Sequence, residues 1–213
     1  TGVDFGLALL TEKNPAANTT AREWTALKAS ATGASFVGVT GLTVDASAIN
    51  VEITRKATDN TLVDYNAQNQ VVQTGTVANP STITLDLAAS LGEVTRASGN
   101  ITIDAFGFFR VSGALALSRS TGTVKLGDLA STPNVNESTN PVTVEQLTIG
   151  GSGLSAFAGI NGGSADPTGL NLTGVNFAVA IQTEKTPAQG QTAREWTAVK
   201  ASATGASFVG VSG

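Results

Sequence analysis

The sequence predicts an all-β protein, and three observations support this class. First, apolar and polar residues alternate along several segments, as in the range 175–181 with its Val, Phe, Val and Ile. Strands with one buried face show this two-residue period. Second, Gly, Pro, Asn and Asp separate these segments, where turns require them. Third, only the ranges 21–31 and 85–94 have a composition that suits a helix.

The chain carries a long internal repeat. Residues 1–41 match residues 173–213 at a constant offset of 172 positions without a gap. The segment TAREWTALKASATGASFVGV at 20–39 recurs as TAREWTAVKASATGASFVGV at 192–211. Long-period repeats of this kind are typical of arrays. We interpret 1–172 as one full period of a tandem array and 173–213 as the start of the next copy. A local duplication within one domain is the alternative.

Weaker periodicity is present within the long period. Val44, Ile103 and Leu172 hold equivalent positions in three segments of similar pattern. We therefore expect three sub-units with loops of unequal length, at about 1–56, 57–119 and 120–172.

The first two strands are expected to form a hairpin with a long polar turn. The segment 21–31 is open to two readings, because its composition also fits a helix. Thr25, Gly33 and the continuation ASFVGV favour a strand, since β-branched and aromatic residues suit extended backbone. The range 85–94 remains a helix candidate.

The alternation continues along the next segments. Between residues 42 and 53 it slips by one position at Ser47 and Ala48, which exchanges the two faces of the strand. Such a slip predicts a bend or a β-bulge. Similar strands are expected at 101–106 and 175–181, and a turn at 131–141.

Two all-β architectures fit these elements. The first is an elongated, solenoid-like β stack of diverged hairpin repeats, in which each sub-unit covers the next. The second is a string of β-sandwiches, one for each long period. Strands rich in Gly and Ala, and the unbroken passage from one repeat to the next, favour the stack.

Composition argues against several functions. The net charge is −4 without a basic run, so nucleic acid is not an expected partner. No apolar segment approaches the roughly 20 residues of a membrane helix, so membrane insertion is not expected. The chain contains no His and no Cys, which excludes a Ser-His-Asp triad and a thiol nucleophile.

An enzyme is not expected from the remaining candidates. Glu12 and Glu23 recur as Glu184 and Glu195, and paired carboxylates can hydrolyse glycosides. Each of them adjoins Lys or Arg at the mouth of a turn, so we interpret them as members of surface ion pairs. No cofactor is expected. Calcium is possible in a long β array, but no cluster of acidic residues indicates a site.

The two tryptophans are the candidate ligand-binding residues. Trp24 follows Arg22 closely, and Trp196 follows Arg194 in the same way. One reading is a platform on which a sugar stacks, with each Arg holding a hydroxyl group. The other is a large anchor that closes the hairpin, with Arg packed on the ring.

Three segments carry a resemblance to a known class of proteins. They are FGFFRVSGALALSRSTGTVKLGD, VEQLTIGGSGLSAFAGINGGSADPTGLNLTGVNFAVA and REWTALKASATGASFVGVTGLTVDASAINVEI. They resemble tandem repeats of giant bacterial surface or secreted proteins, which are adhesin-like and RTX-associated. The resemblance implies an extracellular or cell-surface stalk whose partners are adjacent repeats of the same chain. The alternative is a repetitive module that binds surface glycans weakly and by avidity.

Overall fold

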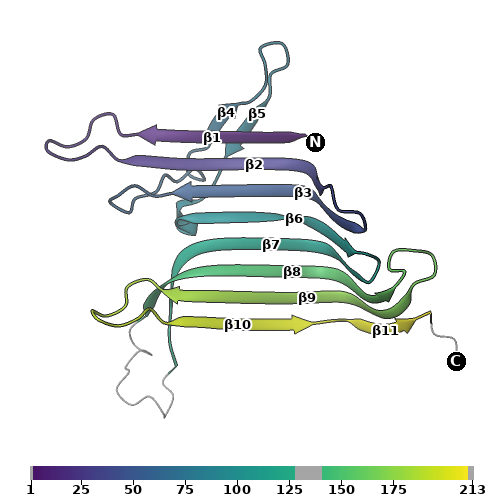
Figure 1. The fold of residues 1–213 in the computed structure, drawn as a ribbon. Helices are drawn as coiled ribbons and strands as arrows, with labels where there is room; N and C mark the ends of the chain where they lie inside the picture. The colour runs from purple at the N-terminus through teal and green to yellow at the C-terminus, as the bar shows by residue number, and fades with distance from the viewer. Residues whose placement is uncertain (1, 128–140, 211–213) are drawn as a thin grey trace.

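The structure is a computed structural model that describes residues 2–127 and 141–210. The described residues form strands and one short 3-10 turn, with no α-helix among them, so the all-β prediction is confirmed (Figure 1). Among the described residues there is also no helix with the length and apolarity that spanning a membrane requires. In chain order the elements are β1 (Val3–Thr11), β2 (Glu23–Phe36), β3 (Leu42–Arg55), β4 (Gln70–Gln73), β5 (Thr82–Leu85), the 3-10 turn (Ala89–Leu91), β6 (Val94–Ala105), β7 (Phe109–Val124), β8 (Val142–Ile160), β9 (Thr168–Glu184), β10 (Glu195–Ser202) and β11 (Gly205–Val209).

One open antiparallel sheet contains nine of the described strands. Its order is β1-β2-β3-β6-β7-β8-β9-β10, and β11 continues beside β9 where β10 ends. Strand β1 lies at one edge, and β10 with β11 lies at the other (Figure 1). Strands β4 and β5 form a separate hairpin within the connection from β3 to β6. Most of the predicted turn at 131–141 lies outside the described residues.

The predicted first hairpin is confirmed. Strand β1 pairs with β2 from Val3 opposite Ala31 to Thr11 opposite Glu23, so the segment 21–31 is mainly strand. The helix candidate at 85–94 was wrong. It contains only the three-residue 3-10 turn, since β5 extends to Leu85 and Gly92 ends the turn with a φ of 71°.

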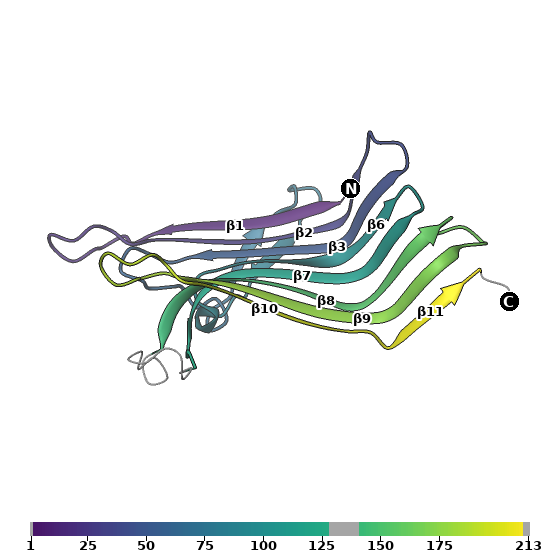
Figure 2. The ribbon, with the colours of Figure 1, turned by 60° about the horizontal axis from the view of Figure 1, so that its bottom comes forward.

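The sheet bends along a line of register irregularities. The predicted slip at Ser47 and Ala48 is confirmed, because Ala48 has a φ of 50° and the pairing of β3 with β6 shifts there. Comparable shifts occur in β7 after Ser112 and in β8 after Gly151. Figure 2 shows neighbouring strands turning to the same side beyond this line. Bulges bend a strand in this way because an extra residue on one side is left unpaired.

The β4–β5 hairpin covers one end of one face of the sheet. We call this the hairpin face, and the opposite side the open face. The core beneath the hairpin consists of Ala8, Ala26, Tyr65, Leu85 and Leu87, with Leu10, Val63, Val72 and Ile83 packed against it. Small residues on the sheet allow this second layer to approach closely.

The open face carries large apolar side chains that no second layer of described residues covers. On β1, Phe5 is 59% exposed and Leu9 is 70% exposed. These residues alternate with Gly6 and Ala8 of the hairpin face, as successive side chains of a strand do.

The division into three sub-units stays a prediction. Val44 and Ile103 lie directly opposite each other in the antiparallel pair β3–β6. The choice between a stack and a string of sandwiches concerns the relation between periods and also stays a prediction.

The bend provides a stability prediction at Gly113. Its φ is 145°, and a Cβ there would lie 2.8 Å from the Cα of Leu154. We expect Gly113→Ala to lower the free energy of unfolding by about 2 kcal/mol, because the backbone must shift to admit the methyl group. Urea unfolding measures the change. The matched control is Gly122→Ala in the same strand, where the added Cβ meets only the Gln146 amide at 3.9 Å. Equal effects of the two substitutions would contradict the described bend.

Candidate functional site

The first candidate cluster closes the β1–β2 hairpin at its long turn. The guanidinium of Arg22 donates to both carboxylate oxygens of Glu12, at 2.7 and 3.0 Å. Its central carbon lies 5.3 Å from the ring centroid of Trp24, which is a cation–π distance. The indole N–H of Trp24 donates to the backbone and hydroxyl oxygens of Thr61, at 3.1 and 3.2 Å. A second carboxylate, from Asp59, lies 3.6 Å from the guanidinium. The cluster therefore ties the hairpin to the segment that follows β3.

The second cluster repeats this geometry at the far edge of the sheet. Arg194 donates to both oxygens of Glu184 at 2.9 Å, and its central carbon lies 5.4 Å from the ring of Trp196. In each cluster the backbone N–H of Glu donates to the backbone oxygen of Arg at 2.8 Å, which adds one pair to the β1–β2 and β9–β10 ladders. The repeated sequence therefore adopts the same local structure in both copies.

Both carboxylates are held in the ionised form. Side-chain hydrogen bonds from Arg22 lower the pKa of Glu12, and those from Arg194 lower the pKa of Glu184. The pKa of Arg22 is raised by the same contact with Glu12. Hydrogen bonds from the hydroxyl and backbone of Thr61 lower the pKa of Asp59. Two parallel hydrogen bonds between charged groups make such pairs directional as well as attractive.

The expected ion pairs are present for Glu12 and Glu184, although the Glu184 side chain is buried and not on the surface. Glu23 and Glu195 form no ion pair with any described residue. Each cluster offers an indole with Arg lying over its ring, and guanidinium donors already directed at a carboxylate. Within the described residues no group of three or more His, Cys, Asp or Glu side chains is placed to hold a metal ion. That Arg22 and Trp24 bind a ligand, and likewise their counterparts in the second copy, stays a prediction.

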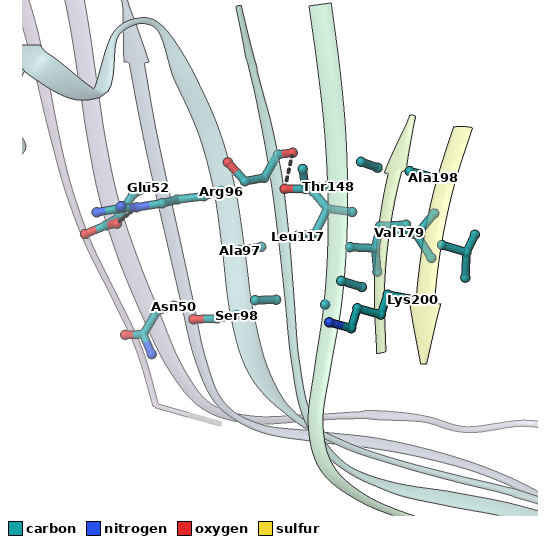
Figure 3. Close-up of a pocket in the computed structure, with 17 residues that line it drawn as sticks. Asn50, Glu52, Arg96, Ala97, Ser98, Leu117, Thr148, Val179, Ala198 and Lys200 are labelled. Atoms are coloured by element: carbon teal, nitrogen blue, oxygen red, sulfur yellow. Dashed lines mark hydrogen bonds and ion pairs between the residues drawn. The ribbon is translucent and has the colours of Figure 1, made fainter. Parts of the chain in front are cut away.

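An open hollow in the hairpin face was missed by the sequence analysis. It has a volume of about 690 Å³ and crosses strands β3, β6, β7, β8, β9 and β10 (Figure 3). Lys200 stands at one end, and an ion pair between Arg96 and Glu52 stands at the other. Between them the hollow is lined by small side chains, among them Ala116, Ser118, Thr148, Gly150, Ala180 and Ala198. These residues come from separate segments, and the strand order and register of the sheet place them on one surface.

Comparisons of the chain with protein-family models, with curated protein sequences and with solved structures give no match. The two Glu–Arg–Trp clusters and the hollow are the structural features that bear on the function of the chain.

The Glu184–Arg194 pair gives a prediction about acid. Because Arg194 lowers the pKa of Glu184, this carboxylate stabilises the fold above the pKa of an unfolded Glu, and the effect disappears as pH falls through the lower folded value. We expect Glu184→Gln to lower the urea midpoint at neutral pH. The deficit should stay constant down to about pH 5 and shrink below it.

The control is Glu195→Gln in β10, whose exposed carboxylate forms no ion pair with any described residue. Its midpoint should follow that of the unchanged chain at every pH. A Glu184→Gln deficit that grows on acidification would contradict the assigned ion pair.

Proposed function

We propose that this chain is a structural module of a repetitive protein, in which each period adds strands to one continuous antiparallel sheet. The repeated hairpin supports the proposal most directly. In the first copy Leu7 lies opposite Leu27, and in the second copy the equivalent Val179 lies opposite Val199. The two copies therefore share sequence, pairing and register.

Strand β9 indicates how successive periods connect. Its later part is equivalent to β1, and it pairs with β8 on one side and with β10 on the other. Among the described strands, β1 pairs only with β2, and we propose that a strand equivalent to β8 pairs with its other edge. The register follows, because Leu147 lies opposite Ile181 and Ile181 is equivalent to Leu9. Leu147 of the preceding copy is therefore proposed to lie opposite Leu9.

The proposed role of the sheet is to provide length and stiffness. One period contributes six strands, namely β2, β3, β6, β7, β8 and β9. The solenoid-like stack expected from the sequence then takes the form of a sheet that runs through the repeats, with no catalytic role. The resemblance to adhesin-like repeats supports an extracellular or cell-surface stalk whose partners are its own neighbouring repeats.

Glycan binding by avidity is the less favoured alternative. A sugar that stacks on Trp24 or Trp196 needs an open ring face and donors that are available for its hydroxyl groups. In both clusters the Arg lies over the ring and directs its donors to Glu. The geometry therefore suits the hairpin anchor better than a carbohydrate platform.

Coupling between periods tests the proposal. In repeat proteins that share an interface, stability rises with repeat number, because each interface adds a favourable term. We expect a chain made of residues 1–172 followed by residues 1–213 to unfold at a higher urea midpoint than the 213-residue chain. The control is the same chain with a Gly/Ser linker inserted at the junction of the copies, which divides the joining strand. It should return to the single-period midpoint. Equal midpoints for all three chains would mean that the periods fold independently.

A further inference from the structure

The β4–β5 hairpin reaches past the edge of the sheet that it covers. Val72 and Ile83 lie above Gly6 of β1, since a Cβ at Gly6 would be 3.3 and 3.1 Å from their side chains. In Figure 1 the loop of the hairpin lies beyond β1, which is the edge strand. Val77 in this loop is fully exposed. The far end of the hairpin therefore extends into the space that a preceding copy would occupy.

The length of this extension follows from strand dimensions. From Val72 and Ile83 to the turn at Thr76–Asn79, each arm continues for about four residues, or roughly 13 Å at about 3.3 Å per residue. Neighbouring strands of a sheet lie about 4.8 Å apart, so the hairpin spans roughly two or three further strands.

The hollow occupies the matching place at the other end of the chain. Gly6, Ala8 and Ala26, which lie beneath the hairpin, are equivalent to Ala178, Ala180 and Ala198 in the hollow. Ala26 has an exposed fraction of 0%, whereas Ala198 is exposed. The same surface is thus covered in the first copy and open in the second.

The hollow also continues in the direction that the hairpin takes. Beyond β9 it runs over β8, at Thr148 and Gly150, and over β7, at Ala116 and Ser118. These are the two strands next in order, which is the distance that the far end of the hairpin spans.

We propose that the hollow is the seat of the β4–β5 hairpin of the following copy, so that each hairpin clamps the junction between two periods. This inference rests on the proposed continuous sheet. It adds a second layer, in which one repeat covers the last strands of the repeat before it.

Polar contacts of the first copy support this occupant. Lys28 pairs with Asp86 at 2.9 Å, and the indole of Trp24 donates to Thr61. Both acceptors belong to the segment that carries the hairpin. The equivalent donors are Lys200, which forms no ion pair with any described residue, and Trp196. Asp86 and Thr61 of the following copy are therefore the proposed partners of these two residues.

Two residues differ between the copies at positions where the hairpin of the following copy would contact the hollow. Ala178 stands where the first copy has Gly6, and its methyl group requires Ile83 of the following copy to give way by a few tenths of an ångström. Gln182 stands where the first copy has Leu10, and its amide donates to Gln146 at 3.5 Å. This amide is therefore bonded within the sheet and needs no partner from the hairpin.

Thiol reactivity tests the inference, because the chain contains no Cys and each variant has a single thiol. We compare Thr148→Cys in the first copy, where Thr148 lines the hollow on β8, between the 213-residue chain and a chain extended after Gly213 by a second copy of residues 42–172. We expect the extension to slow modification of this thiol by about tenfold or more, because the added hairpin covers it. Ile149→Cys, on the open face of the same strand, should react equally fast in both chains.

A third chain separates the hairpin from the sheet. In it, Ile83→Ser and Leu85→Ser in the added copy remove the apolar contacts of the hairpin and leave the strands that extend the sheet. We expect this chain to restore fast modification of Thr148→Cys. Protection that persists in this chain would overturn the hairpin as the occupant.

Hydrogen exchange of the β10 amides distinguishes the proposed continuous sheet from the proposed seat of the hairpin. These amides should become protected in the extended chain, since β10 then pairs with the added β3. Protected amides together with a fast-reacting thiol would overturn the seat and leave the continuous sheet standing. If neither the amides nor the thiol became protected, both proposals would be overturned.

Discussion

The hydrogen-bonding edge of β1 is the constraint on which the account depends. An antiparallel strand has two rows of N–H and C=O groups, and an edge strand leaves one row without a protein partner. Strand β9 carries nearly the same sequence as β1 and has both rows paired, to β8 and to β10. The chain thus contains one copy of the strand at the edge of the sheet and one copy inside it. In the proposed continuous sheet, the internal copy gives the partner and the register of the edge copy.

A sheet extended in this way needs a second layer to bury apolar surface, and the β4–β5 hairpin provides it. Gly6, Ala8 and Ala26 are small because the hairpin lies directly on them. The Glu12–Arg22–Trp24 cluster then acts as an anchor, since Trp24 donates to Thr61 in the segment that leads to the hairpin. The cluster that composition suggested as a sugar platform is better explained as the point where the second layer is fastened.

The sequence was sufficient for features that depend on local pattern. Thr25, Gly33 and the continuation ASFVGV identified the strand at 21–31, and the slip at Ser47 identified the bulge, because both leave a signal within a few residues. The repeat offset showed that the two Arg–Trp pairs are equivalent. The hairpin strands β4 and β5 are only four residues long and gave no periodic signal. The hollow was not predictable, since Thr148 and Ala180 become neighbours only through the β8–β9 register.

The length added by each period tests the continuous sheet most directly. Six strands at about 4.8 Å per strand amount to about 29 Å per period. Small-angle X-ray scattering of chains with one, two and three periods measures this increment as the growth of the maximum dimension. The account predicts an unchanged cross-section and an increment that approaches about 29 Å per added period as the sheet becomes longer than its strands. An increment well above this value, or flexible beads in place of a rod of constant section, would show that the periods are separate domains.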